Sequence, residues 1–509
     1  MMEENEKTNV MEPEMAAELP LLLFVSRSFR FRCLVDAREE ILERECIHPR
    51  KFDALLQQLQ EEERTKAILL REFERLDNPI PVDELADAFK SLDMNASEIV
   101  TLTYQLGMEG FLSTSFEGDS DVPLFKHYTS DPRAIEPAYK PVNVITDGSA
   151  CSGCGMCETV CPVGCVSVND GRVSIDMDTC IRCGLCFTAC PRSFLPKKAL
   201  EWSTTGNHFT RNEIKIGHVL EAWSAKSLQE DVDAVKQDGG VTSTLLIHAL
   251  DSGRVTSAIG AGTREGEPWN PVPVIMKTRR QVLEAAGTKY VNTPSLKLLS
   301  SLSAEPGIAI VGTPCMMQAL WKGEKYPTHL LDLSNVKYKL GIFCMESFTY
   351  QGIKHLAEKI LGTSLNDIRK MDINKGKFFM YPRDGGAFTA GMKDVGKLAR
   401  LGCHCCYDLT SESADISIGS IGSKPGWNTV LIRNENGKEL FDSAVAAGLL
   451  EKKPIPDVIP GLPLLKKLSF RKKRQYERTE RKRDADNAFH PLYDLRLWPK
   501  PVKKKKVDT

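Results

Sequence analysis

The chain has 509 residues, and its 67 basic and 68 acidic side chains leave a net charge of −1. Because a single hydrophobic core rarely serves more than roughly 250–300 residues, this length predicts two to four domains. A mean hydropathy of −0.26 excludes a mostly membrane-embedded chain, and the early apolar run at 19–25 is shorter than the roughly 20 residues of a spanning helix. We therefore expect a cytoplasmic protein with no direct membrane span.

The first 130 residues divide into an extension and a patterned module. Residues 1–60 form an acidic N-terminal extension with weak helical signals. Residues 61–130 show three helices and a hairpin, expected at 64–76, 82–91, 95–109, 111–116 and 122–127. Asn95 is the expected N-cap of the third helix. This order predicts a winged-helix-like module.

Charge on the third helix argues against nucleic acid as the ligand of this module. The segment 95–109 contains Glu98 and Glu109 but neither lysine nor arginine, whereas a helix in a phosphate-lined groove needs basic side chains. We therefore expect a protein-docking module and no nucleic-acid partner. The proline-rich residues 131–148 predict a linker.

Sixteen cysteines are the most informative residues, and nine of them fall between positions 151 and 190. In a reducing compartment, clustered cysteines indicate metal ligands rather than disulfides. Within residues 149–198 the pattern CxxCxxCxxxCP occurs twice, which is the spacing of bacterial ferredoxins with two 4Fe-4S clusters.

In this arrangement three thiolates of one run surround one cluster, and the fourth reaches the other cluster. One cluster is expected on Cys151, Cys154, Cys157 and Cys190, and the second on Cys180, Cys183, Cys186 and Cys161. Zinc would need two pairs of ligands rather than two runs of four with a trailing proline. Cys165 lies outside the pattern, and we expect it to be a small buried residue.

Residues 212–465 alternate strand-like and helix-like segments, which predicts a multidomain α/β or α+β protein. Expected strands cover 257–261, 307–311, 338–343 and 429–433, and expected helices cover 242–250, 279–286 and 351–361. Residues 466–509 form a basic C-terminal tail. Its charges leave two interpretations open, a solvated helix or a docking surface for an anionic partner or an acidic coenzyme.

Several motifs in a fixed order carry a resemblance to a known family. They are DGGVT at 238–242, GTKY at 287–290, GTPC at 312–315, FCMESF at 343–348, CxxCxD at 403–408 and ADIS at 414–417. Together with the ferredoxin block, they resemble the family of coenzyme F420 hydrogenase/dehydrogenase beta subunits over about 150–470. The chain departs from the family at Gly419-Ser420, where Gly-Asp is usual, and at Met316-Met317 after Cys315.

The resemblance implies an FAD-binding domain with a third 4Fe-4S cluster. The implied ligands of this cluster are Cys315, Cys344, Cys403 and Cys406, and Cys405 could displace one of them. A Gly-Gly turn before a helix lets N–H groups approach a phosphate, and lysines could neutralise the cofactor's negative charge. Candidate FAD-binding residues are Gly239, Gly240, Thr242, Lys289, Tyr290, Gly312, Thr313, Pro314, Lys375 and Lys377. Catalytic residues stay unassigned.

The remaining candidates receive simpler expectations. We expect His404 to be a bystander and Asp408 to hydrogen-bond its own loop rather than act as a ligand. Cys33 and Cys46 are expected to be structural.

The resemblance implies an F420H2:acceptor oxidoreductase subunit of archaeal-type energy metabolism, with coenzyme F420 as its substrate. FAD would exchange hydride with F420, and the clusters would pass single electrons to a partner. The expected partners are other subunits of a hydrogenase, heterodisulfide reductase, formate dehydrogenase or membrane dehydrogenase type of complex. Two alternatives stay open: a ferredoxin-dependent flavin reductase of another substrate, and a non-catalytic electron-wiring subunit.

Overall fold

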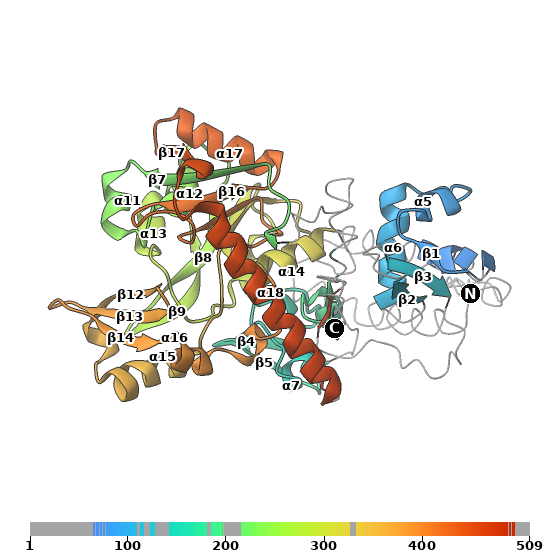
Figure 1. The fold of residues 1–509 in the computed structure, drawn as a ribbon, viewed down its shortest axis with the longest axis horizontal. Helices are drawn as coiled ribbons and strands as arrows, with labels where there is room; N and C mark the ends of the chain where they lie inside the picture. Colours follow the sequence, from blue (N-terminus) through green and yellow to red (C-terminus); the bar gives the residue numbers. More distant parts are fainter. Residues whose placement is uncertain are drawn as a thin grey trace, which may run out of the picture. The chain divides into compact units, whose positions relative to one another are not determined.

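The computed structural model divides the chain into two compact units (Figure 1). One unit contains residues 1–140, and the other contains residues 141–180 and 185–497. None of the described helices is long and apolar enough to cross a membrane. The structure describes residues 65–66, 68–70, 72–73, 75–76, 78–108, 112–116, 123–127, 142–180, 185–195, 197, 215–325, 332–486, 488–489 and 491–493.

The N-terminal unit contains the expected third helix and hairpin. Helix α6 (Ala96–Met108) begins after Asn95, whose side-chain oxygen accepts a hydrogen bond from the Glu98 N–H at 2.9 Å, as an N-cap does. Strands β2 (Leu112–Phe116) and β3 (Pro123–His127) pair antiparallel, which confirms the hairpin.

The second expected helix of this unit is shorter than predicted. Ile80–Pro81 form strand β1, which pairs with β3 at the edge of the sheet, and helix α5 covers only Leu85–Ala88. Proline has no N–H to donate, so it fits an edge strand as well as the first turn of a helix. The described residues between positions 65 and 76 are helical, as expected.

The ferredoxin block opens the larger unit. Its elements are α7 (Asn143–Asp147), α8 (Met156–Thr159), β4 (Val166–Asn169), β5 (Arg172–Ile175), α9 (Leu185–Ala189) and β6 (Phe194–Leu195). Strands β4 and β5 form an antiparallel hairpin between the two cysteine runs. Helix α7 lies in the segment assigned to the linker by sequence, and the side chain of Ile145 in it is buried.

An eight-stranded sheet follows, in the order β17-β7-β16-β15-β11-β10-β8-β9. Its strands are β7 (Glu221–Ser227), β8 (Ser257–Arg264), β9 (Glu267–Met276), β10 (Ile308–Gly312), β11 (Val336–Ile342), β15 (Ile416–Gly419), β16 (Asn428–Ile432) and β17 (Leu450–Pro454). The pairs β8–β10, β10–β11 and β11–β15 are parallel. The four strands expected from sequence are therefore confirmed as β8, β10, β11 and β16.

The helices that accompany this sheet are α11 (Glu230–Val235), α12 (Val241–Asp251), α13 (Arg279–Glu284), α14 (Pro314–Lys325) and α17 (Glu435–Ala446). Alternate residues of β16 show that both faces of the sheet are covered. Val430 packs in the core that includes residues of α12 and α17, whereas the next residue, Leu431, packs with Leu465 in a separate core. The predicted helices at 242–250 and 279–286 are confirmed as α12 and α13.

Strand β9 was missed because it contains Pro268, Pro271 and Pro273. Prolines within a run normally argue against a strand. Here β9 forms the edge of the sheet, where one side of its backbone has no neighbouring strand to pair with. An edge position is where strand prolines are tolerated.

A smaller sheet lies in the same unit and has the order β12-β13-β14 (Ile368–Asn374, Lys377–Pro382 and Phe388–Gly391). The helix predicted at 351–361 begins as α15 (Tyr350–His355) and continues as a π-helical turn over Leu356–Leu361. Helix α16 (Met392–Val395) follows β14.

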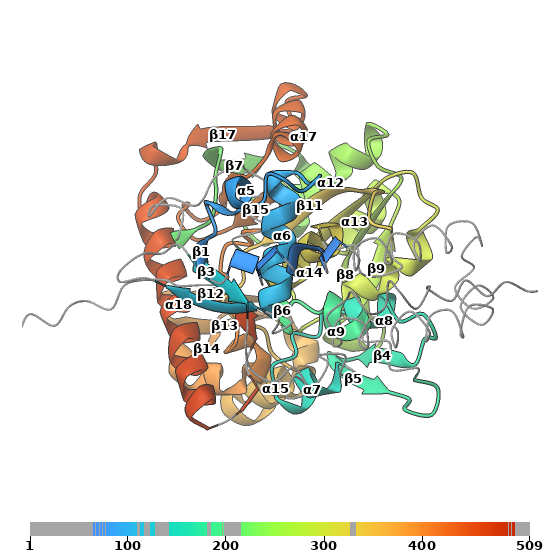
Figure 2. The ribbon, with the colours of Figure 1, turned by 90° about the vertical axis from the view of Figure 1, so that its right-hand side faces the viewer.

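The basic segment after β17 forms the 25-residue helix α18 (Gly461–Ala485). Figure 1 shows α18 running from the end of the sheet near β17 towards α7, and Figure 2 shows the same path after rotation. At its far end Arg483 donates to the backbone oxygen of Gly148 at 2.5 Å. A short strand, β18 (Leu492–Tyr493), then pairs with β6 of the ferredoxin block.

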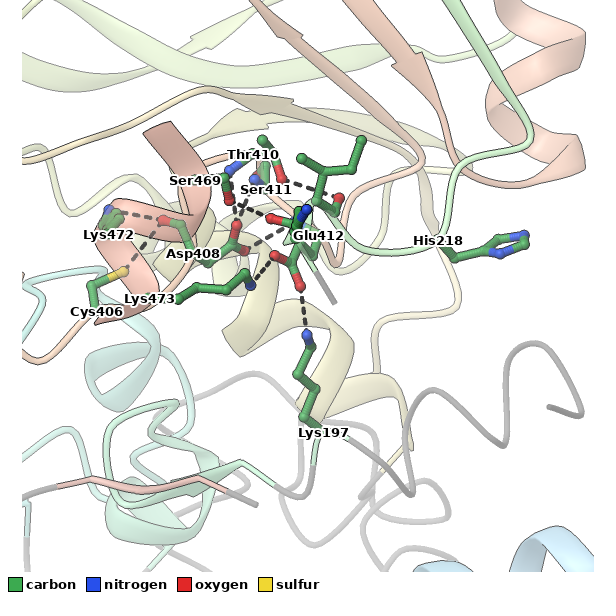
Figure 3. Close-up of polar contacts among 12 residues, drawn as sticks. Lys197, His218, Cys406, Asp408, Thr410, Ser411, Glu412, Ser469, Lys472 and Lys473 are labelled. Atoms are coloured by element: carbon green, nitrogen blue, oxygen red, sulfur yellow. Dashed lines mark hydrogen bonds and ion pairs between the residues drawn. The ribbon is translucent and has the colours of Figure 1, made fainter. Parts of the chain in front are cut away.

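One buried carboxylate joins three distant parts of this unit (Figure 3). Glu412 lies between Lys197, at 2.5 Å, and Lys473 of α18, and the exposed fraction of each of these side chains is 4% or less. Burial raises the pKa of Glu412, but the charges of the two lysines outweigh this effect and lower it to about 2. The pair of cations therefore keeps Glu412 ionised inside the protein.

Replacing Glu412 with Gln is expected to lower the free energy of unfolding by about 3–5 kcal/mol, because two buried ammonium groups then lose their counter-charge. Denaturant unfolding of the purified chain, followed by circular dichroism, measures this loss. The matched control is Glu451→Gln, which removes a half-exposed partner of Lys226 and should leave stability nearly unchanged. Equal effects of the two substitutions would contradict the role given to Glu412.

The same pair of contacts predicts the direction of a pH effect. The folded-state pKa of Glu412 lies below its ordinary value of 4.5, so its contribution to stability is complete above pH 4.5. The contribution is lost as the pH falls from about 4.5 toward 2. Glu412→Gln should therefore flatten this part of the stability curve.

Candidate functional site

The topology of the large sheet gathers the expected ligands at one edge. Strands β8, β10, β11 and β15 are parallel, so their carboxyl ends lie on the same side. Cys315 follows β10 and Cys344 follows β11. The loop that carries Cys403 and Cys406 precedes β15, and it is brought to the same edge by a hydrogen bond from the Cys344 N–H to the backbone oxygen of Leu409 at 2.9 Å. The carboxyl edge of a parallel sheet is where α/β proteins commonly bind ligands.

The four cysteines of the implied third cluster are close neighbours. Burial raises the pKa of the Cys344 thiol, and negative charge on Cys403, Cys315 and Cys406 raises it further. The Cys403 sulfur accepts a hydrogen bond from the Ser347 N–H at 3.4 Å, and Cys315 contacts the Thr313 hydroxyl at 3.1 Å. The structure thus brings together the residues that the resemblance indicated.

Cys405 lies beside this group. Its side chain is buried, and charge on Cys406 and Cys403 contributes to raising its pKa after burial itself. Its backbone oxygen accepts a hydrogen bond from Arg192 at 3.1 Å. His404 instead contacts Gln475 through Nδ1 at 3.5 Å.

Asp408 has the structural role expected for it. Its carboxylate accepts hydrogen bonds from the backbone N–H groups of Thr410, Ser411 and Glu412 at 2.8–2.9 Å. These bonds close the turn directly after Cys406 (Figure 3). Asp408 therefore holds the shape of the ligand loop.

The cysteines expected to bind the first ferredoxin cluster also lie close together. Burial raises the pKa of Cys157 most strongly, and charge on Cys154, Cys190, Cys151 and Cys186 adds to it. The sulfur of Cys151 accepts a hydrogen bond from the Gly153 N–H at 3.3 Å, and that of Cys190 accepts one from the Arg192 N–H at 3.4 Å. Backbone N–H groups thus point at the sulfurs, as they do around iron–sulfur clusters.

The second group is described except for Cys183, which lies outside the described residues, as do Cys33 and Cys46. Within it, Cys165 is buried, as expected, but its sulfur lies 3.4 Å from that of Cys161. The hydrogen bond from Cys165 lowers the pKa of Cys161 to about 6. Cys165 therefore contacts an expected ligand, which the spacing pattern gave no reason to predict.

The ferredoxin block and the sheet meet at their cysteines. Charge on Cys315 contributes to raising the pKa of Cys154, after burial and charge on Cys190. The buried Arg192 lies between the groups, because it follows Cys190 by two residues and its charge interacts with those of Cys406 and Cys315. Lys322 of α14 donates to the backbone oxygen of Cys190 at 2.9 Å. The cysteines of the two domains thus form one continuous series.

Among the described residues, no three His, Cys, Asp or Glu side chains converge closely enough to bind one metal ion. Thiolates around a 4Fe-4S cube bind four separate irons, so they are farther apart than the ligands of one ion. Several thiols of this chain are buried and neighbouring, and N–H donors and cations lie beside them. Such an arrangement is suited to binding a 4Fe-4S cluster.

The predicted Gly-Gly turn opens α12. Gly240 has a φ of 74°, and a Cβ on Gly239 would lie 2.6 Å from the backbone nitrogen of Asn428, so both positions require glycine. The side-chain oxygen of Asn428 accepts a hydrogen bond from the Val241 N–H at 3.3 Å. The next two N–H groups, of Thr242 and Ser243, have no hydrogen-bond partner among the described residues. These two donors suit the phosphates of a dinucleotide such as FAD.

Tyr290 lies near this turn, since charge on Asp238 contributes to raising its pKa after burial and charge on Asp372, whereas Lys289 contacts the end of α13. The Lys289 ammonium donates to the backbone oxygens of Ala285 and Ala286, and burial lowers its pKa to about 8. The Tyr290 ring packs edge-on against Phe378 of β13, with centroids 5.1 Å apart. In this structure Lys289 thus stabilises the end of α13, a role that the GTKY motif did not predict.

Lys375 and Lys377 are exposed at the turn between β12 and β13, and Gly312, Thr313 and Pro314 lead from β10 into the cysteine site. A basic residue that contacts this segment is Lys370, which donates to the Gln237 oxygen at 2.8 Å. Asp372 is also near, since its charge raises the pKa of Asp238 after burial does. Sequence reasoning missed both residues because no motif surrounds them.

Comparisons with known proteins agree with this geometry. The profile "Coenzyme F420 hydrogenase/dehydrogenase, beta subunit N-term" matches residues 222–300, and the corresponding C-terminus profile matches residues 306–458. The profile "4Fe-4S dicluster domain" matches residues 150–194.

Two named relatives and one solved structure are similar to much of the chain. The coenzyme F420 hydrogenase subunit beta of Methanosarcina barkeri is 38% identical over 53% of this chain and 93% of its own length. A subunit of the F(420)H(2) dehydrogenase of Methanosarcina mazei is 34% identical over 62% of this chain and 88% of its own length.

The solved structure is a chain of the xenon-derivatised F420-reducing NiFe hydrogenase complex of Methanosarcina barkeri. It is 36% identical, with a TM-score of 0.53, over 55% of this chain and 97% of that chain. Motifs, cysteine placement and these matches lead to one conclusion: the chain belongs to the family of coenzyme F420 hydrogenase/dehydrogenase beta subunits and contains a 4Fe-4S dicluster segment before the family domain.

Proposed function

We propose that the chain is the F420-oxidising or F420-reducing subunit of a larger redox complex. When bound, FAD would supply hydride exchange with coenzyme F420, and three 4Fe-4S clusters would carry single electrons. Relatives named as subunits of F420 hydrogenase and F(420)H(2) dehydrogenase support this assignment. The partner would be another subunit of a hydrogenase, heterodisulfide reductase, formate dehydrogenase or membrane dehydrogenase type of complex.

The observation that carries the proposal is the continuous series of cysteines. Direct contacts join the two groups, since a Cβ on Gly402, next to Cys403, would lie 2.1 Å from the backbone oxygen of Cys151, and Arg192 donates to the backbone oxygen of Cys405 at 3.1 Å. Charge on Cys315 also contributes to raising the pKa of Cys154, after burial and charge on Cys190. This series begins at the sheet edge and ends in the second ferredoxin group. It supports Cys315, Cys344, Cys403 and Cys406 as ligands of one cluster and the eight ferredoxin cysteines as ligands of two more.

The residues around α12 would hold the FAD. The N–H groups of Thr242 and Ser243 would bind a phosphate, and Gly239 and Gly240 give the backbone the required path. Thr313 and Pro314 come from the same sheet edge and would face the cofactor from the cysteine side. Lys370 supports the turn by its bond to Gln237.

Two other functions predict different properties of the purified protein. One relative, 28% identical over 59% of this chain and 46% of its own length, is named coenzyme F420-dependent sulfite reductase. This name favours, as a second candidate, an enzyme with another final substrate. Bound FAD with F420H2 oxidation supports our proposal. Bound FAD without this activity supports a ferredoxin-dependent flavin reductase of another substrate, and absence of flavin supports a wiring subunit.

Metal content is the first prediction. Three 4Fe-4S clusters require about twelve iron atoms per chain. Inductively coupled plasma mass spectrometry of anaerobically purified protein measures both iron and zinc. About eight irons would mean that the cysteines of the sheet hold no cluster, and zinc in place of iron would overturn the ferredoxin assignment.

A second prediction separates the cysteine site from the flavin site. Cys403→Ser should leave the bleaching of FAD by F420H2 intact, because the FAD candidates lie on other segments. Bleaching of the ferredoxin clusters should slow by orders of magnitude. Stopped-flow absorbance records both phases in one trace.

The outcomes of this experiment also decide the role of Cys405. If Cys405→Ser gives the defect and Cys403→Ser does not, Cys405 is the ligand. If both phases of Cys403→Ser match those of the unsubstituted protein, Cys403 does not lie on the electron route. Loss of flavin together with the cluster would show that the two sites are not separable.

The N-terminal unit would serve assembly rather than nucleic-acid binding. Its helices and strands follow the order of a winged-helix module, and α6 contains no lysine or arginine. A recognition helix for DNA needs cations toward the phosphates. We therefore assign it to docking with a protein partner.

Deletion of residues 1–135 is accordingly expected to leave iron and flavin contents unchanged. The fraction of the chain that elutes in a high-mass complex from native extract should fall, as gel filtration with quantitative mass spectrometry would measure. Tight, salt-sensitive binding of duplex DNA by the intact chain, abolished by this deletion, would overturn the assignment.

A further inference from the structure

The basic helix α18 directs two of its cations into the protein. Lys472 and Lys473 are buried, although neighbouring residues such as Arg471 and Arg474 are exposed. Lys473 is neutralised by Glu412. Among the described residues Lys472 has no carboxylate within ion-pair distance, and the charges of Asp408 and Glu346 act on it only from farther away. Its positive charge therefore also needs a closer counterpart.

The contacts of Lys472 identify that counterpart. Its ammonium donates to the backbone oxygen of Cys344 at 2.6 Å and to that of Asp408 at 2.8 Å. One of these oxygens lies on the loop after β11, and the other lies two residues after Cys406. Figure 3 shows Lys472 on α18 beside Cys406 and Asp408. A single cation therefore joins two of the three segments that carry the expected ligands.

The electrostatics agree with this position. The ammonium of Lys472 is buried between the segments that carry Cys344 and Cys406, so negative charge on thiolates there would act on it with little screening by water. The lysine and the thiolates stabilise each other's charged forms in a place with little access to water.

We propose that Lys472 tunes the reduction potential of the cluster held by Cys315, Cys344, Cys403 and Cys406. Each electron that enters a thiolate-bound cluster adds negative charge, and net charge and burial set such potentials. A buried ammonium between the ligand loops favours the reduced form and so raises the potential. Lys472 is a positioning residue for electron transfer, and this inference rests on the proposed function of these cysteines.

Arg192 is another buried cation near this site, but it is a poorer test. It follows Cys190 by two residues, and its own charge interacts with those of Cys406 and Cys315. Substitution of Arg192 would therefore disturb two clusters together. Lys472 contacts the loops of only the sheet cysteines.

The experiment is a redox titration of the intact chain, monitored by electron paramagnetic resonance. The step that is missing in Cys403→Ser identifies the cluster of the sheet. In Lys472→Met this step should move to a more negative potential. The equilibrium constant for reduction of the cluster should fall by about tenfold or more, which corresponds to a shift of about 59 mV for one electron. Lys472→Arg keeps the charge and should recover most of the shift.

Lys467→Met is the matched control, because it removes the same charge from an exposed position on the same helix. It should leave every step unchanged. An unshifted step in Lys472→Met with full iron content would overturn the proposal. Loss of about four irons in Lys472→Met would also overturn it, since the lysine would then hold the loops together rather than tune the potential.

Failure of the proposed ligand set gives a different result. If Cys403→Ser and Cys405→Ser each retain all the steps and all the iron, the sheet cysteines hold no cluster. Both proposals then fail. If instead Cys403→Ser loses one step, as expected, and Lys472→Met leaves that step unshifted, only the role of Lys472 is rejected.

Discussion

Burial of thiolates beside one another is the constraint on which the larger unit depends. Cys154, Cys157, Cys190 and Cys406 are each less than 9% exposed, and burial together with like charge opposes their ionisation in most cases. A protein that gathers such groups must place cations or N–H donors against them. Arg192, Lys322 and Lys472 contact the backbone of these loops, so charge compensation and loop geometry come from the same side chains.

Helix α18 links this requirement to the architecture. Leu465 packs against the sheet through Leu431, while Lys472 and Lys473 reach the loop between Cys406 and Glu412. The far end of the helix contacts Gly148 next to the ferredoxin block. One element thus fixes the sheet, the ligand loop and the ferredoxin segment together. Most of its basic residues are exposed or half-buried, whereas Lys472 and Lys473 are buried beside specific partners.

The sequence predicted the elements whose signals are local. Strands β10 and β16 are apolar runs, and α6 is an amphipathic stretch with its cap at Asn95. Strand β9 and the edge strand β1 were missed because their prolines are compatible with a strand only at a sheet edge. Edge position is a property of the assembled sheet, and no window of residues contains it.

For the candidate site, spacing alone determined the two ferredoxin runs, because ligands three residues apart must share a loop. The order of the GTPC, FCMESF and CxxCxD motifs indicated the family, which the comparisons confirmed. Only the tertiary structure could bring Cys315 near Cys154 and turn Lys472 inward. These contacts join residues on different loops and elements, and their distances follow from packing, which no local pattern records.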